Sequence, residues 1–165
     1  MELEIIKHND ILFRDLIRGI ALKNVAWPHP IESQLKWIID NMHSEDMHVF
    51  LSEEGKDVAY MTLSPVTGIL NGIETDFLGI GCVCSALKGM GYGNRLMQEV
   101  NRYLEKRNAK GLLFCREGVI KFYQKNNWQL IPQENLQVED PHEGVFTMVY
   151  NCEGVQSLEY SDREF

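Results

Sequence analysis

One short segment limits the fold of this chain more than any other: a strand-like run that passes through a glycine-rich turn into a helix. Residues 77–83 form the run, and glycines follow at alternate positions, Gly89, Gly91 and Gly93. From Asn94 onwards, apolar residues recur at helical spacing. Because glycine has no Cβ, the N–H groups of such a turn can come close to a ligand, and the helix start adds further N–H donors and a positive dipole end. The segment therefore predicts a socket for a phosphate or pyrophosphate group.

Two well-known glycine motifs do not fit this turn. The dinucleotide-binding fingerprint requires G-x-G-x-x-G, whereas the third glycine here comes one residue early. The P-loop requires Lys and then Ser or Thr after its last glycine, whereas Asn94 and Arg95 follow Gly93. The ligand of the turn is therefore expected to be neither a nicotinamide dinucleotide nor a nucleotide held by a P-loop.

The turn instead resembles the acyl-CoA loop of the GNAT superfamily of N-acetyltransferases. The family pattern is Arg or Gln, two residues, Gly, one residue, then Gly or Ala, after a strand that ends in Val; residues 88–93 and Val83 match it in register. Lys88 stands where the family usually has Arg or Gln, which keeps a cation without the planar fork of Arg. The resemblance implies acetyl-CoA as the cofactor. It implies that the CoA-binding residues are Cys82, Val83, Lys88, Gly89, Met90, Gly91, Tyr92, Gly93 and Asn94.

A second stretch, F-Y-Q-K-N-N-W at residues 122–128, resembles the later motif of the same family. That motif has an aromatic pair, a Lys, and Gly followed by Phe or Trp. Asn127 replaces the usual Gly, and Asn tolerates the same left-handed conformation. In the family, a Tyr of this helix donates a hydrogen bond to the departing sulfur, which implies that role for Tyr123. A plain core position for Tyr123 stays open, because Val119 and Ile120 lie one helical turn before it.

The general base is less well marked. Some aminoglycoside N-acetyltransferases, which this chain resembles in places, have a Glu where it has Gly79. Asp76 and Glu74, slightly earlier, are the candidates, acting directly or through water; both also fit solvent-facing charges at a strand end. We expect direct transfer of the acetyl group from acetyl-CoA to a primary amine in a ternary complex. The alternative is a non-catalytic acyl-CoA-binding sensor or partner module, which the missing Glu and Lys88 favour.

The order of predicted elements, β-α-α-β-β-β-α-β-α-β-β, is that of the GNAT fold. We therefore expect an α/β (α+β) fold, with a mixed, mostly antiparallel sheet flanked by helices and a splayed central strand pair. Gly79 and Gly81 share one face of the central strand, which requires a bulge or a close neighbour; in the family, the pantetheine arm of CoA enters there. Residues 1–151 are predicted to form a single GNAT-like domain, with a polar connection over 132–144, and residues 152–165 a C-terminal extension.

The composition limits the cellular location and the binding partners that are expected for the chain. The chain has 165 residues and a net charge of −8, so no basic surface for nucleic acid is expected. No apolar run is long enough to span a membrane, and the acidic N-terminus does not read as a signal peptide. Four cysteines without C-x-x-C spacing are expected to be reduced thiols rather than a metal site, which favours the cytoplasm. The acceptor is expected to be an amine of a small molecule or a peptide, and a homodimer is left open.

Overall fold

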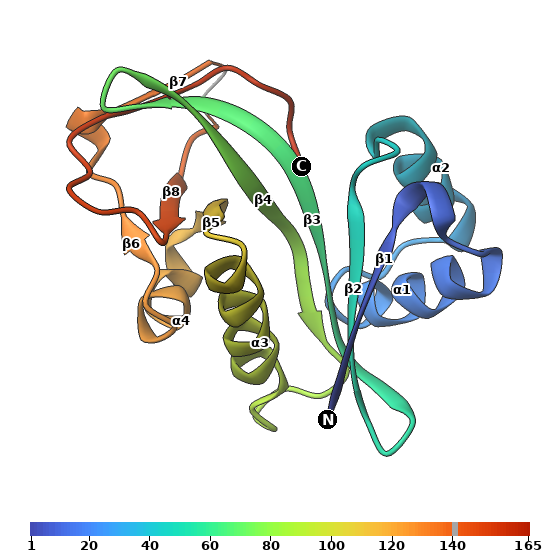
Figure 1. The fold of residues 1–165 in the computed structure, drawn as a ribbon. Helices are drawn as coiled ribbons and strands as arrows, with labels where there is room; N and C mark the ends of the chain where they lie inside the picture. The colour runs from blue at the N-terminus through green and yellow to red at the C-terminus, as the bar shows by residue number, and fades with distance from the viewer. Residues whose placement is uncertain (140–141) are drawn as a thin grey trace. The chain divides into compact units, whose positions relative to one another are not determined.

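The computed structural model of the chain describes residues 1–139 and 142–165. Figure 1 shows its elements. The helices are α1 (Phe13–Ala26), α2 (Ile31–Asn41), α3 (Tyr92–Lys106) and α4 (Ile120–Lys125), with short 3-10 turns at His8–Asp10, Glu117–Val119 and Gln133–Asn135. The strands are β1 (Glu2–Lys7), β2 (Met47–Glu53), β3 (Lys56–Leu70), β4 (Ile73–Ser85), β5 (Lys110–Arg116), β6 (Gln129–Leu130), β7 (Leu136–Val138), β8 (Val145–Tyr150) and β9 (Leu158–Tyr160). Residues 140–141, within the connection predicted over 132–144, lie outside the described residues.

The chain forms two compact units, each of which is described by itself. The first consists of Met1–Ser64, Gly81–Glu99 and Phe165, and the second of Pro65–Ile80 and Val100–Glu164. Strands β3 and β4 and helix α3 contribute residues to both units.

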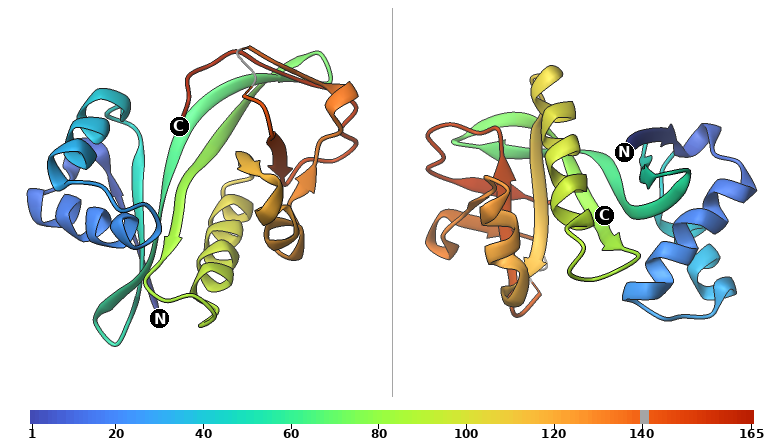
Figure 2. Two further views of the ribbon diagram at one scale, coloured as in Figure 1. Left: turned by 180° about the vertical axis from the view of Figure 1, so that it is seen from behind. Right: turned by 90° about the horizontal axis from the view of Figure 1, so that it is seen from below.

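In the first unit, β1, β2 and the beginning of β3 form an antiparallel sheet. Ile5 pairs with Val49, and Met47 with Leu63. Helices α1 and α2 lie together on one side of β1 and β2 (Figures 1 and 2). The centre of β2 is fully buried, and α1 and α2 add Ile20 and Ile38 to the same core. Burial of these apolar side chains is what holds the helices against the strands.

The second unit contains strands of mixed direction. Residues 77–79 of β4 pair in parallel with 110–112 of β5, whereas β5 with β8 and β6 with β8 are antiparallel. Strand β9 pairs antiparallel with β3 and parallel with β7. The strand pairings along the chain are mixed and mostly antiparallel, with helices beside the strands, which confirms the predicted fold class. Residues 158–160 of the predicted extension form one of its strands.

Two hairpin turns follow directly from the residues that form them. Glu54 and Gly55 join β2 to β3, and Asn71 and Gly72 join β3 to β4, all with φ between +50° and +77°. Such pairs of positive φ angles define the tight primed turns whose twist matches that of the strands, and Asn-Gly is the favoured pair. The side chain of Asn71 also accepts the N–H groups of residues 156 and 157, at 2.7 and 3.0 Å. The second turn therefore also holds the chain before β9.

None of the helices in the described residues is long and apolar enough to cross a membrane.

Candidate active site

Strand β4 is irregular at Cys82, where φ is +54°. A positive φ is uncommon for any residue other than glycine and breaks the alternation of faces along a strand. Phe77 and Ile80 are both buried although they lie three residues apart, so burial along β4 does not alternate strictly even before Cys82. The irregularity expected in the central strand is therefore present, at Cys82.

The close neighbours of Gly81 are main chain and side chain of the same unit. A Cβ built at Gly81 would lie 2.9 Å from Oγ1 of Thr62 and 3.0 Å from the carbonyl carbon of Phe165. The first distance is shorter than real Cβ atoms show and the second is tighter than nearly all of them, so a side chain at Gly81 would force Thr62 or Phe165 to move. The close approach that the sequence predicted here is made by Thr62 and Phe165.

The loop between β4 and α3 has the conformation that its glycines allow. Gly89 and Gly91 have φ of +81° and +78°, and no described heavy atom beyond their chain neighbours lies within 4 Å of a Cβ built at either. Glycine is therefore required there by the backbone conformation, and the space in front of the loop is open. Lys88, just before Gly89, and Met90, between the two glycines, are exposed.

Helix α3 begins at Tyr92, two residues before the predicted start. The N–H of Arg95 donates to the carbonyl of Gly91 at 3.0 Å, which is the first bond of the helix. Tyr92 and Gly93 therefore occupy the first turn, where the N–H groups have no acceptor within the helix. A loop of alternate glycines followed by such a turn is a donor set that fits the diphosphate of a CoA molecule.

Two contacts hold this loop on the hairpin of β2 and β3. The N–H of Ala86 donates to the carbonyl of Val58 at 2.9 Å, and the hydroxyl of Tyr92 donates to Oε2 of Glu53 at 3.1 Å. The bond to Glu53 raises the pKa of Tyr92. Glu53 did not stand out in the sequence, because nothing in the residue pattern joins it to a tyrosine 39 positions later.

Tyr123 belongs to the second unit and lies on α4. It is 8% exposed, and its ring packs edge-on against Phe122 with the centroids 5.0 Å apart. Among the described residues its hydroxyl has no hydrogen-bond partner. This hydroxyl is not completely shielded from solvent, because the described residues contain no fully buried side-chain oxygen or nitrogen without a partner. Burial raises the pKa of Tyr123 above its ordinary value of 10, so the phenol stays protonated at neutral pH. Asn127 ends this helix with φ of +65°, as its place in the second motif predicts.

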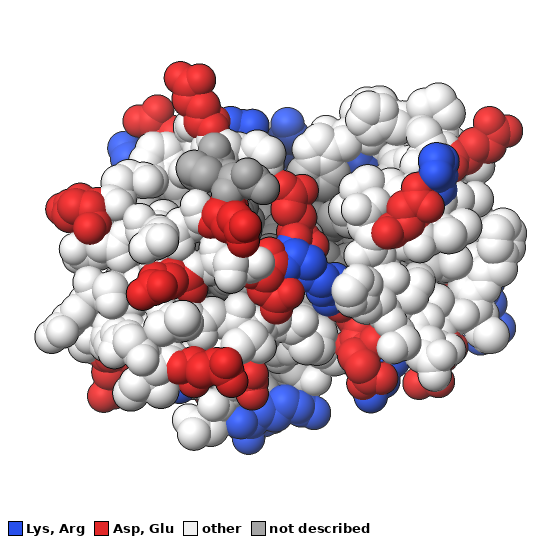
Figure 3. Space-filling model, turned by 90° about the horizontal axis from the view of Figure 1, so that it is seen from above, with Lys and Arg blue, Asp and Glu red and all other residues white. Residues whose placement is uncertain are grey.

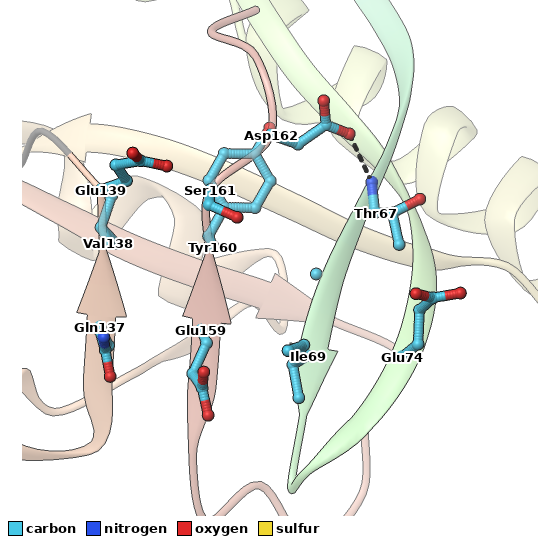
Figure 4. Close-up of a pocket in the computed structure, with 11 residues that line it drawn as sticks. Thr67, Ile69, Glu74, Gln137, Val138, Glu139, Glu159, Tyr160, Ser161 and Asp162 are labelled. Atoms are coloured by element: carbon cyan, nitrogen blue, oxygen red, sulfur yellow. Dashed lines mark hydrogen bonds between the residues drawn. The ribbon is translucent and has the colours of Figure 1, made fainter.

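Asp76 and Glu74 are both exposed on β4 in the second unit. Oγ1 of Thr67 donates to Oδ1 of Asp76 at 3.3 Å. Glu74 lines a cavity of about 630 Å³, which β3, β4, β7 and β9 enclose (Figure 4). Their role as general base stays a prediction.

The cavity beside Glu74 brings together carboxylates that are far apart in the sequence. Glu74, Glu139, Glu159 and Asp162 all line it. Oδ2 of Asp162 accepts the N–H of Thr67 at 2.8 Å, drawn as the dashed line in Figure 4. Figure 3 shows Asp and Glu side chains spread over the face of the molecule that it views. The sequence did not single out this group, because β7 and β9 are too short to show a periodic pattern.

A second cavity, of about 430 Å³, lies within the first unit. It is bounded by the end of α1, by α2, by the loop between these helices and by the irregular residue of β4. The residues that line it are Lys23, Trp27, His29, Ser33, Gln34, Trp37 and Cys82.

Comparison with known proteins decides the family. The model of the acetyltransferase (GNAT) family matches residues 13–128, a span that contains both the glycine loop and Tyr123. The chain belongs to this family.

Solved structures of GNAT proteins share the fold. They include an acyl-CoA N-acyltransferase from Pseudomonas aeruginosa (16% identity, 90% of this chain and 99% of that chain covered, TM-score 0.63). The aminoglycoside 6′-N-acetyltransferase from Enterococcus faecium is similar (14% identity, 91% and 96% covered, TM-score 0.62). So is the catalytic domain of the Tetrahymena GCN5 histone acetyltransferase in complex with coenzyme A (19% identity, 93% and 95% covered, TM-score 0.60). No curated protein matches the chain.

Proposed function

We propose that this GNAT protein transfers an acetyl group from acetyl-CoA to a primary amine, directly and in a ternary complex. The observation that carries the proposal is the open loop between β4 and α3. Gly89 and Gly91 hold it at positive φ, with empty space before it. Membership of the acetyltransferase family and the complexes of other GNAT proteins with coenzyme A support the same reading.

In this proposal, the loop between β4 and α3 binds the cofactor. Main-chain N–H groups of residues 89–94 would hold the diphosphate, and the ammonium of Lys88 would add a positive charge beside it. Since Lys88 is exposed, it can reach a phosphate without the burial of an unpaired charge. The main chain at Cys82 and Val83, where β4 is irregular, would face the acyl group. When bound, acetyl-CoA supplies a thioester whose carbonyl carbon accepts the amine nitrogen while the C–S bond breaks.

Tyr123 would hold the proton that the leaving thiolate requires. Its raised pKa keeps that proton on the phenolic oxygen at neutral pH, and its hydroxyl has no competing partner among the described residues. A hydroxyl that is protonated and has no other partner can donate a hydrogen bond to the departing sulfur.

The proton of the amine requires a different group. Gly79 has no side chain to accept it, so the proposal assigns this role to Asp76 or Glu74, directly or through water. Asp76 is held by Thr67, whereas Glu74 lies among other carboxylates at the cavity of the second unit.

The test is the release of free thiol from acetyl-CoA in the presence of a panel of primary amines, with calorimetric titration of CoA alongside. The proposal predicts thiol release that depends on an amine and an acetylated amine in equal amount. Tight binding of CoA with no amine-dependent release would instead assign the chain as a non-catalytic acyl-CoA-binding module, the alternative that Lys88 and Gly79 favour. No binding of CoA would remove both assignments.

A further inference from the structure

The cavity of the first unit has aromatic walls from two elements. Trp27 directly follows α1 and Trp37 lies on α2, and these two residues are 45% and 38% exposed. Large indole rings at the edge of a concave site offer flat apolar area to a ligand with little loss of conformational entropy. At about 430 Å³, the cavity is in the range of small-molecule sites.

Lys23 is the unusual residue of this cavity. It is 7% exposed, and its ammonium lies 4.2 Å from the centroid of the Trp37 ring. Among the described residues, no carboxylate or other hydrogen-bond acceptor contacts this ammonium, which nevertheless is not sealed from the cavity. A lysine buried along most of its length is stabilised by an anion at its ammonium, and contact with an indole supplies only part of that stabilisation. A ligand with a negative group would complete the site.

The groups around Lys23 do not supply that charge. Its charge acts on His48 and Cys84, and both are neutral at pH 7: burial lowers the pKa of His48 to about 4 and raises that of Cys84 to about 12. Gln34, also buried, uses its amide to donate to the carbonyl of Trp27 at 3.3 Å. Two carboxylates act on His48: Asp46, whose Oδ2 accepts the N–H of His43 at 2.9 Å, and Asp15, which is bound to Arg18 at 2.9 Å.

The loop that contributes Trp27 is braced. Oδ1 of Asn24 accepts the N–H of His29 at 2.9 Å, and Gln34 ties the same loop to α2. The walls of the cavity are therefore formed before any ligand binds, which favours affinity because less chain must be ordered. The remaining wall includes Cys82, the irregular residue of the strand to which the proposed function assigns the acyl group.

We propose that this cavity is the acceptor subsite of the transferase: it takes a small primary amine that also carries a carboxylate beside a flat apolar group, as an aromatic α-amino acid does. The carboxylate pairs with Lys23, and the ring lies against Trp27 and Trp37. The proposal rests on the function assigned above. The acidic cavity of the second unit does not single out a ligand in the same way, because Glu74, Glu159 and Asp162 are exposed to water.

The experiment uses three related probes with the full chain. Phenylalanine has both the amine and the carboxylate, phenethylamine lacks the carboxylate, and 3-phenylpropionate lacks the amine. Calorimetric titration measures their binding to the protein without CoA. The proposal predicts that phenylalanine and 3-phenylpropionate bind at least tenfold more tightly than phenethylamine. Equal affinities of the three probes, or tightest binding of phenethylamine, would overturn it.

Variants of two lysines distinguish binding at this site from a general effect of the protein's net charge. Lys23→Met should weaken both carboxylate probes at least tenfold and leave phenethylamine unchanged, whereas Lys23→Arg keeps the charge and should stay within a few-fold of the wild type. Lys36, on α2, is exposed and paired with Asp40, so Lys36→Met is the matched control and should change nothing. Equal effects of Lys23→Met and Lys36→Met would overturn the proposal; thermal unfolding of each variant shows that it is folded.

Two further readouts separate this proposal from the function on which it rests. With phenylalanine as acceptor, Lys23→Met should raise KM at least tenfold and leave kcat within about twofold. If amines release thiol but a carboxylate gives no advantage, the transferase stands and the subsite is wrong. If 3-phenylpropionate binds through Lys23 but no amine releases thiol, the acceptor role is wrong. Displacement of 3-phenylpropionate by CoA would assign Lys23 to the cofactor and also contradict the proposal.

Discussion

The hydroxyl of Tyr92, the first residue of α3, donates a hydrogen bond of 3.1 Å to the carboxylate of Glu53, the last residue of β2. The bond fixes the end of the glycine loop to the neighbouring hairpin. In the proposed function the loop would bind through main-chain N–H groups, so its conformation would decide its affinity for a phosphate.

The first prediction concerns this bond. Glu53→Gln replaces a charged acceptor with a neutral one, and Tyr92→Phe removes the donor. Either change should weaken CoA binding by about threefold, as expected for the loss of one partly exposed hydrogen bond. Glu54→Gln alters the adjacent carboxylate, which forms no bond to Tyr92, and should leave the affinity unchanged. The measurement is a calorimetric titration with CoA; equal affinities in all the variants would show that the bond does not hold the loop.

The second prediction concerns Tyr123. Tyr123→Phe should lower kcat about 100-fold, because the departing thiolate loses its proton donor, with CoA affinity within twofold of the wild type. Tyr160 is the matched control: it too is buried in the second unit, but its hydroxyl donates to the carbonyl of Arg163. Tyr160→Phe should leave kcat unchanged. Steady-state kinetics measure kcat for both variants. Normal turnover in Tyr123→Phe would show that Tyr123 is a core aromatic residue without a catalytic role.

The third prediction concerns the stability of the first unit. The guanidinium of Arg18 binds Asp57 through two bonds of 2.8 and 2.9 Å, reaches Asp15 and Glu4, and covers the ring of Phe50 at 4.3 Å. Arg18→Met leaves these carboxylates without a cation, and we expect a loss of about 2–3 kcal/mol in the free energy of unfolding.

Arg14, exposed one turn earlier, is the control for Arg18. Its only contact with a carboxylate among the described residues is 3.7 Å from Asp15. Arg14→Met should change the free energy of unfolding by less than about 0.5 kcal/mol. Unfolding in urea measures both variants. A loss in Arg18→Met no larger than that in Arg14→Met would show that the network does not stabilise the unit.

The fourth prediction concerns the stability of the fold at acid pH. His48 is 1% exposed, with its ring bonded to the hydroxyl of Tyr60 at 2.7 Å and to His8 at 3.0 Å. Burial lowers the pKa of His48 to about 4 and also lowers that of His8. The unfolded chain binds these protons near pH 6.5, so their contribution to stability is complete above pH 6.5 and is lost as the pH falls toward 4.

The expected slope is at most about 1.4 kcal/mol per pH unit for each histidine. Urea unfolding between pH 8 and pH 4.5 measures it, and NMR titration of the His48 ring gives its pKa directly. A stability that stays level below pH 6.5, or a His48 pKa near 6.5, would contradict the account of this buried pair.

Local signals in the sequence predicted the parts of the site that depend on backbone conformation. The spacing of Gly89 and Gly91 and the apolar stripe of α3 act within a few residues, so the loop and its helix could be recognised from the residues alone. The same is true of the Asn71 turn and of Asn127, because Asn tolerates positive φ.

The remaining features depend on contacts that no local pattern carries. Cysteine has no preference for positive φ, so the irregular residue of β4 could not be assigned to Cys82 in advance. Lysine is almost always exposed, so the burial of Lys23 against Trp37 could be found only from packing. The reverse also occurs, with apolar residues exposed: Leu12 and Phe13 have the helical spacing of core residues at the start of α1 but are 53% and 67% exposed.

The central claim is that the glycine loop binds CoA through its main chain, and a pair of glycine variants tests it most directly. Gly91 and Gly55 have φ of +78° and +74° and open space at the position of a Cβ, so valine strains the backbone equally at both. Calorimetric titration with CoA should show no binding by Gly91→Val and wild-type affinity in Gly55→Val. Normal binding of CoA by Gly91→Val would contradict the claim.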